Sequence, residues 1–172
     1  MFKQSIAAAA AAVCMMAVAS NASAQSAWSP ANATVNVNQT GSSAVLFNTV
    51  TLNCKPASNT AFQLGTPASG AAFTVTSTAN PFVGNGTFTD ALLCPTIQLY
   101  NQPWAGTINS GGPSVWNVSL ANVRARTTTG TYCEGTLNGT LTEGNSFSVN
   151  GTLGSCQVTL NFTLAQNINI TP

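Results

Sequence analysis

The chain has very few charged residues and no histidine. Of its 172 residues, 4 are Lys or Arg and 3 are Asp or Glu. Enzymes that use acid–base, metal or nucleophilic chemistry draw on grouped His, Asp, Glu, Lys and Cys side chains. Because the sequence offers no such group, we expect no catalytic residue, no cofactor site and no metal site. A non-enzymatic role, in structure or in binding, is therefore predicted.

The first 24 residues predict a secretory signal peptide. Lys3 supplies a positive start, residues 6–19 form an apolar run, and Ala22-Ser23-Ala24 is a small-residue cleavage site. The apolar run is too short for a spanning helix, and no later segment approaches the roughly 20 apolar residues that one needs. We therefore expect export to the extracellular space or cell surface, with residues 25–172 forming a single domain without a transmembrane segment.

The charges that remain after loss of the leader cancel one another. They are Lys55, Arg124 and Arg126 against Asp90, Glu134 and Glu143. A neutral surface attracts neither nucleic acid nor anionic membrane, since both bind clustered Lys and Arg. It also lacks the repulsion that keeps copies of a protein apart. We expect no nucleic-acid partner and predict self-association, as homo-oligomers or as fibres.

Four cysteines lie beyond the leader, at Cys54, Cys94, Cys133 and Cys156. An even set in a chain bound for an oxidising compartment predicts two disulfides. Of the three possible connectivities we favour the sequential one, Cys54 with Cys94 and Cys133 with Cys156, because each bond would then join neighbouring strands. No pair has the close C-x-x-C spacing of a structural zinc site, which disfavours that alternative.

Apolar Val, Leu, Ile and Phe alternate with Thr, Ser and Asn along most of the chain, and no window shows a helical period. Clusters of Asn, Gly and Pro separate these runs, as turns require. About ten short strands predict an all-β fold, an antiparallel β-sandwich or barrel braced by two disulfides. They are expected at residues 33–40, 44–54, 61–64, 72–77, 96–100, 106–109, 115–126, 132–142, 147–153 and 156–170.

Aromatic and glycine residues refine this prediction. Trp104 and Trp116 are expected in the core; the alternative is an exposed platform, shared with Tyr100, for sugar or hydrocarbon. Gly135 and Gly139 lie on the inward face of one strand, where close packing of a disulfide or an aromatic ring would explain both.

The last alternating segment, residues 156–170, is far longer than a typical strand. It is interpreted as a long central strand of the domain. The alternative is a strand exchanged between subunits, for which residues 33–40 are a second candidate. Uncharged strand edges would make such an exchange easier.

The charged residues have modest expected roles. Arg124 and Arg126 share one strand face, which we interpret as solvated in preference to anion-binding. Glu134 and Glu143 flank one hairpin but are not favoured as paired glycosidase carboxylates. Asp90 is interpreted as a turn residue.

Several short segments resemble, in the same order, the bacterial secreted activators of alkane oxidation, the Pra-type proteins. These segments are Ser29-Pro30, Thr49-Val50-Thr51-Leu52-Asn53-Cys54, Leu93-Cys94, Asn101-Gln102-Pro103-Trp104, Cys133-Glu134-Gly135-Thr136-Leu137-Asn138-Gly139 and Gly154-Ser155-Cys156-Gln157-Val158. The resemblance implies an extracellular, non-enzymatic protein linked to growth on hydrocarbons and to biofilm adhesion. It brings no catalytic residues.

Three hypotheses follow. The leading one is a secreted surface or matrix protein that acts by adsorption, to a hydrophobic surface or hydrocarbon, and by self-association. The second is a polymerising fimbria-like subunit that uses terminal strand exchange. The third is a carbohydrate-binding module, which would depend on exposed aromatic side chains.

Overall fold

The computed structural model describes residues 26–40, 43–47, 50–58, 61–77, 82–84, 86–126 and 130–171. The predicted signal peptide lies outside these ranges, and its cleavage stays a prediction. Within the described ranges, no helix combines the length and the apolar character needed to cross a bilayer.

The described residues form strands, one α-helix and one short 3-10 helix. The strands are β1 (Ala27–Ser29), β2 (Thr34–Gln39), β3 (Ser43–Phe47), β4 (Val50–Pro56), β5 (Phe62–Gly65), β6 (Ala72–Ser77), β7 (Phe82–Gly84), β8 (Gln98–Tyr100), β9 (Trp104–Gly111), β10 (Val115–Arg126), β11 (Tyr132–Thr142), β12 (Gly144–Leu153) and β13 (Cys156–Thr171). The helices are α1 (Phe88–Leu93) and η1 (Cys94–Thr96).

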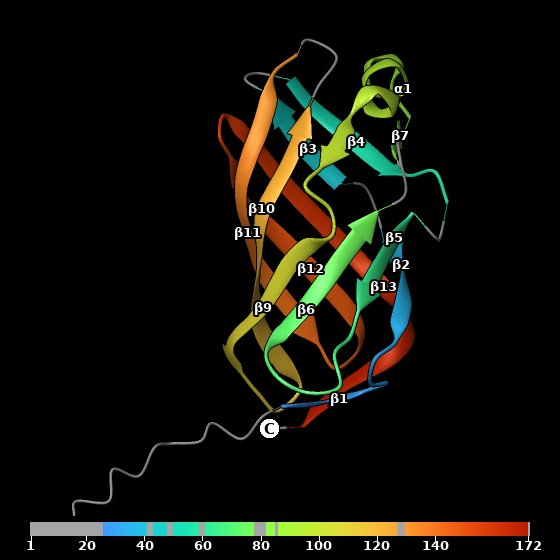
Figure 1. Cartoon of the computed structure of the whole chain (residues 1–172). Helices are drawn as coiled ribbons and strands as arrows, with labels where there is room; N and C mark the ends of the chain where they lie inside the picture. The colour runs from blue at the N-terminus through green and yellow to red at the C-terminus, as the bar shows by residue number, and fades with distance from the viewer. Residues whose placement is uncertain are drawn as a thin grey trace, which may run out of the picture.

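Eight of the strands close into a barrel (Figure 1). The pairing runs β12, β11, β10, β9, β6, β5, β2, β13 and returns to β12, and every pair is antiparallel. A barrel of eight strands has an interior that side chains can fill. The all-β prediction is confirmed, and of the two predicted architectures the barrel is the one observed.

The interior is apolar because alternate residues of each strand point inward. Along β10, for example, Trp116, Val118 and Leu120 are buried, while Asn117 is exposed. The buried side chains form one core. Burial of Trp104 and Trp116 confirms their core assignment, so the alternative of an exposed tryptophan platform is wrong.

The two glycines of β11 allow a close approach of backbones. A Cβ on Gly139 would lie 1.8 Å from the carbonyl oxygen of Ser148, and one on Gly135 would lie 3.0 Å from that of Thr152. Both oxygens belong to β12. The expected cause, a ring or disulfide over the glycines, is therefore wrong: the neighbouring strand itself occupies the space, as at a tightly coiled barrel wall.

The strand β13 is the long central strand that the sequence predicted. β12 pairs with it from Cys156 to Ile168. β3 and β2 pair with residues 156–159 and 162–164 of the same stretch, and β1 pairs with residues 169–171. β2 is likewise bonded to both β5 and β13. Exchange of either strand between subunits would first have to break these ladders, so the structure gives that prediction no support.

A smaller unit branches from the barrel. β3 pairs with the first residues of β13, β4 pairs with β3, and β7 pairs with β4. We call β3, β4, β7, α1 and η1 the side unit. The sequence predicted one strand over residues 44–54, where the structure has the hairpin β3–β4. It also predicted no helix, no β1 and no β7, and it extended β8 backward over Thr96, which belongs to η1.

Candidate functional site: an exposed apolar tip

The helix α1 begins at a side-chain cap. Thr87 precedes the helix, and its Oγ1 accepts a hydrogen bond of 3.1 Å from the backbone N–H of Asp90. This is the first half of a capping box, in which a hydroxyl side chain satisfies a free N–H of the first turn. The spacing Thr87-x-x-Asp90 is the one sequence signal that could have predicted the helix.

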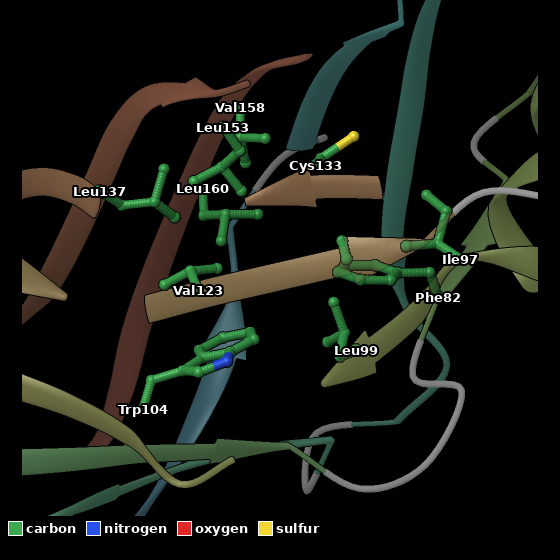
Figure 2. A pocket seen from close by; sticks show the side chains of 11 residues that line it. Phe82, Ile97, Leu99, Trp104, Val123, Cys133, Leu137, Leu153, Val158 and Leu160 are labelled. Atoms are coloured by element: carbon green, nitrogen blue, oxygen red, sulfur yellow. The ribbon is translucent and has the colours of Figure 1, made fainter. Parts of the chain in front are cut away.

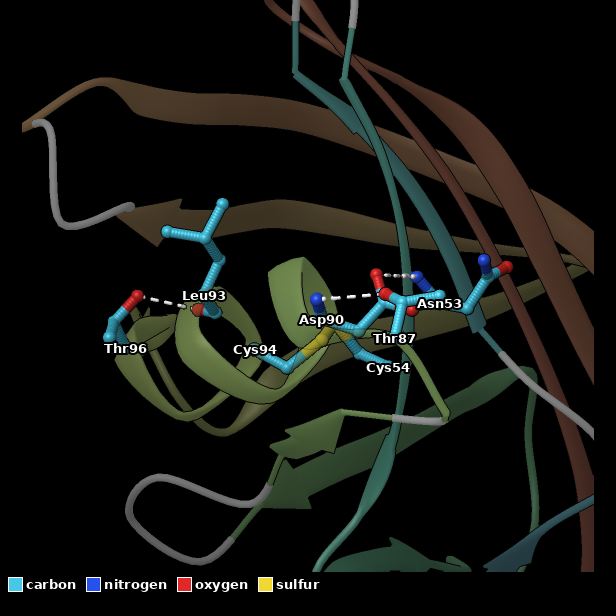
Figure 3. Close-up of a disulfide and its surroundings, with 7 residues drawn as sticks. All are labelled: Asn53, Cys54, Thr87, Asp90, Leu93, Cys94 and Thr96. Atoms are coloured by element: carbon cyan, nitrogen blue, oxygen red, sulfur yellow. Dashed lines mark hydrogen bonds between the residues drawn. A yellow bond between two sulfur atoms is a disulfide. The ribbon is translucent and has the colours of Figure 1, made fainter.

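Asp90 fixes the helix to the side unit. Its side chain is 1% exposed, and its Oδ1 accepts a hydrogen bond of 3.2 Å from the backbone N–H of Asn53 on β4 (Figure 3). The prediction that Asp90 is a turn residue is therefore wrong. It is a buried anchor, because its Oδ1 exchanges water for a backbone donor, while Oδ2 is buried without a hydrogen-bond partner.

A disulfide fastens the other end of the helix. Cys94, directly after α1, is bonded to Cys54 of β4, with the two Cα atoms 5.5 Å apart (Figure 3). β7, which pairs with β4 at Cys54 and Gly84, also touches the helix backbone, since a Cβ on Gly84 would lie 2.2 Å from the carbonyl carbon of Asp90. A six-residue helix is too short to be stable alone, so these contacts are what hold it.

The helix exposes two large apolar side chains, Phe88 and Leu92, which we call the apolar tip. Phe88 is 80% exposed and Leu92 is 55% exposed. They are four residues apart, so they lie on the same face of the helix. Leu93 instead packs against the core. In Figure 1, α1 lies at one end of the molecule and β1 at the other. The tip is therefore an apolar projection from a surface otherwise rich in Thr, Asn and Ser.

An apolar cavity lies inside the barrel (Figure 2). Phe82 and Ile97, which flank the α1–η1 segment, line it together with Leu99, Trp104, Val123, Ala125, Cys133, Leu137, Leu153, Val158 and Leu160. Its volume is about 30 Å³. This is close to the share of one molecule in liquid water, and far below the roughly 150 Å³ of a cavity that accepts benzene. This cavity, lined by residues that the structure describes, does not have room for an alkane.

The second disulfide joins Cys133 of β11 to Cys156 of β13. Both half-cystines are buried in the core. Together with Cys54–Cys94, it completes the two disulfides in the sequential pairing that the sequence favoured. One disulfide thus braces the barrel and the other braces the side unit.

The two glutamates are not a catalytic pair. Glu134 lies at the start of β11 and Glu143 just beyond its end, which separates their backbones by about 30 Å. Glycosidase carboxylates lie within about 10 Å of each other. The Glu143 carboxylate instead accepts the N–H groups of Trp116, at 3.4 Å, and Ile170, at 3.0 Å. Glu134 faces Arg124, with 3.3 Å between Oε2 and Nε.

The residues that the structure describes bring no three His, Cys, Asp or Glu side chains together as a metal site would need. What the fold defines is a disulfide-braced antiparallel barrel whose distinctive surface feature is an anchored apolar tip. Family comparison gives the more particular result. The model of the family described as alkane oxidation protein activator PraA/PraB-like matches residues 1–172, so the chain belongs to that family. Curated proteins yield no match, and solved structures yield none.

Membership confirms the resemblance to the Pra-type proteins. The family is described as an activator of alkane oxidation, which is compatible with a non-enzymatic role. The apolar tip itself was not singled out in the sequence, because Phe88 and Leu92 do not belong to a run long enough to show a period.

Proposed function

We propose that the protein is an exported, non-enzymatic activator of growth on alkanes that adsorbs to hydrocarbon through its apolar tip. Family membership supplies the link to alkanes. The observation that carries the proposal is the 80% exposure of Phe88 on a helix held by a disulfide and a buried carboxylate. Single exposed apolar side chains are common, but Phe88 and Leu92 lie together on one face of a fixed helix and form a small apolar patch that an apolar partner can cover.

The free energy gained when the tip enters hydrocarbon is large enough to direct adsorption. Full burial of a Phe or Leu side chain contributes about 1.5–3 kcal/mol. Scaled to the exposed fractions of Phe88 and Leu92, transfer of the tip into hydrocarbon contributes roughly 2–4 kcal/mol per molecule. Little opposes this gain, because the one charged residue of α1, Asp90, is already buried and bonded. No exposed charge on the helix has to lose its water.

Contact at the surface fits the structure better than transport inside it. The cavity of about 30 Å³ is too small for an alkane chain, and side chains of the buried core line it. The disulfide Cys54–Cys94 holds the helix, and with it the apolar tip, in a fixed position on the side unit. Activation would then consist of bringing the cell surface or its matrix into contact with oil.

The same tip gives the predicted self-association a site. Two copies that meet through Phe88 and Leu92 would bury them from water without hydrocarbon. So few side chains make a small interface, and contacts of that size are weak and reversible. Adhesion in biofilms would follow if the tip met other hydrophobic surfaces.

Enrichment of purified protein at a hexadecane–water boundary tests the proposal. The variant carrying Phe88→Ser and Leu92→Ser should show roughly thirtyfold or greater loss of enrichment, as 2–4 kcal/mol implies. Val115→Ser is the matched control, since Val115 is 46% exposed on β10, away from α1. It should leave enrichment unchanged.

Equal enrichment of wild type and double variant would contradict the proposal, as would equal losses in the double variant and Val115→Ser. Circular dichroism and a count of free thiols establish that each variant retains the fold and both disulfides. Cells that carry the double variant should also grow more slowly on hexadecane, but not on a water-soluble carbon source.

A further inference from the structure

A second surface feature lies on the barrel wall, on the outer face of β8, β10 and β11. Three strands place six side chains there in cross-strand register. On one row Arg124 pairs with Tyr100 on β8 and with Glu134 on β11. On the next row Arg126 pairs with Gln98 and with Tyr132. We call these six residues the tyrosine–arginine face. It holds both tyrosines of the chain and half of the charges beyond the leader.

A bulge in β10 gives the face its orientation. The register of β10 against β11 shifts between Leu120 and Val123, and Asn122 there has a φ of 55°. Asn accepts this left-handed conformation more readily than most residues do. The extra residue resets the alternation, so that Val123 and Ala125 point into the core while Arg124 and Arg126 point outward.

The rings and guanidinium groups of the face contact one another. The Cζ atom of Arg124 lies 4.1 Å from the centre of the Tyr132 ring, and that of Arg126 lies 5.4 Å from it. The rings of Tyr100 and Tyr132 are 6.2 Å apart. Cation–π contacts of this kind hold flexible arginines in place. Tyr132 still remains 45% exposed, so part of its ring is open to a partner.

The charge of the face is only partly balanced. Glu134 pairs with Arg124 at 3.3 Å. The other acidic residues, Asp90 and Glu143, are engaged elsewhere in the fold. Asp90, Glu134 and Glu143 all lie in the part of the chain that the structure describes. None of them forms a salt bridge with Arg126. A guanidinium without a carboxylate partner therefore stands beside an exposed aromatic ring.

We propose that the tyrosine–arginine face binds an acidic polysaccharide, with one uronate unit at its centre. A guanidinium offers two parallel N–H donors that match a carboxylate. The ring of Tyr132 offers an apolar surface for the C–H face of a sugar, and its hydroxyl, like that of Tyr100, can bond sugar hydroxyls. One carboxylate for each sugar unit suits a face with one unpaired guanidinium.

Nucleic acid fits the face less well. Its affinity comes from neutralising many phosphates along a backbone, and tight binders make several such contacts. Here two arginines are present and one is already paired. The proposal is independent of the apolar tip, which lies on α1 in the side unit. A protein with both features could join a polysaccharide matrix to oil.

Calorimetric titration of purified protein with polygalacturonate tests the proposal, with neutral dextran and single-stranded DNA as comparison probes. We expect binding of polygalacturonate and no binding of dextran. Arg126→Gln should weaken the binding by about tenfold or more, the value of one charge-assisted hydrogen bond. Tyr132→Ala should weaken it severalfold, because it removes the ring on which the sugar packs. Tyr132→Phe should retain most of the affinity, because it keeps the ring.

Two charge variants make the test specific. Lys55→Gln removes an exposed positive charge on β4 and should leave the affinity unchanged. Glu134→Gln should strengthen binding severalfold, since it frees Arg124 for a second carboxylate. The proposal is overturned by absence of polygalacturonate binding, by an equal loss in Lys55→Gln and Arg126→Gln, or by DNA binding as tight as polygalacturonate binding.

Discussion

The barrel buries its large apolar side chains, whereas the side unit exposes two of them. In the barrel, alternation along the strands, reset by the bulge in β10, places Leu, Val, Phe and Trp inside, and the eight strands leave no unpaired edge in the ring. The side unit has short strands and a helix of six residues, and it presents Phe88 and Leu92 to solvent. Each part has its own disulfide. We infer that the regular barrel supplies stability and the irregular side unit supplies the contact surface.

Removal of the barrel disulfide should have the largest effect on the stability of the barrel itself. The variant with Cys133→Ala and Cys156→Ala loses a cross-link that closes a loop of 23 residues. Chain-entropy reasoning gives a loss of about 3–4 kcal/mol in the free energy of unfolding. Urea denaturation followed by tryptophan fluorescence measures it, since all three tryptophans are buried.

The same removal at Cys54 and Cys94 sharpens the contrast. It should release α1 while the barrel stays folded, so hydrogen exchange should accelerate in residues 88–93 and remain slow in β10 and β13. If hydrogen exchange also accelerated throughout β10 and β13, the barrel and the side unit would unfold as one. That result would contradict separate roles for the two parts.

A matched pair of leucines separates the regions further. Leu137 is 0% exposed in the barrel, and Leu92 is 55% exposed on the tip. Leu137→Ala should lower the free energy of unfolding by about 3 kcal/mol, because it enlarges an interior cavity. Leu92→Ala should change it by less than about 0.5 kcal/mol. Similar losses in urea denaturation for both variants would contradict the assignment of the tip to the surface.

A smaller and local effect is expected at Asp90. Asp90→Ala leaves the backbone N–H of Asn53 without its acceptor, which costs about 1–3 kcal/mol. Asp90→Asn keeps an acceptor oxygen and is the matched control. The measurement is proteolysis near α1 and at the barrel wall. We expect Asp90→Ala to be cleaved faster than Asp90→Asn near the helix and at the same rate at the barrel wall. Equal rates of cleavage near the helix in the two variants would contradict the anchoring role of the carboxylate.

The sequence predicted the barrel far better than the side unit, and the reason is physical. Strands such as β10 and β11 alternate over many residues, so their period is unmistakable and their predicted bounds match the structure. Alternation does not say how strands pair, which left the choice between sandwich and barrel open. The disulfide partners were predicted on the expectation that each bond joins neighbouring strands. The pairing is right but the reason is wrong, since β12 lies between β11 and β13 and Cys94 lies in η1.

The candidate site could not be predicted in the same way. α1 is shorter than two turns, so it has no hydrophobic period, and its one local signal was the cap at Thr87 and Asp90. Its position depends on long-range contacts, from Asp90 to Asn53 and from Cys94 to Cys54. Whether Phe88 is exposed is decided by those contacts, and not by the residues next to it.

Hydroxyl-radical footprinting of the protein adsorbed on hexadecane droplets tests the central claim most directly. If the tip meets the oil, Phe88 and Leu92 should be labelled severalfold less on droplets than in solution, while Tyr132 and Val115 are labelled equally in both. Unchanged labelling of Phe88, or protection spread over the barrel wall, would contradict adsorption through the tip.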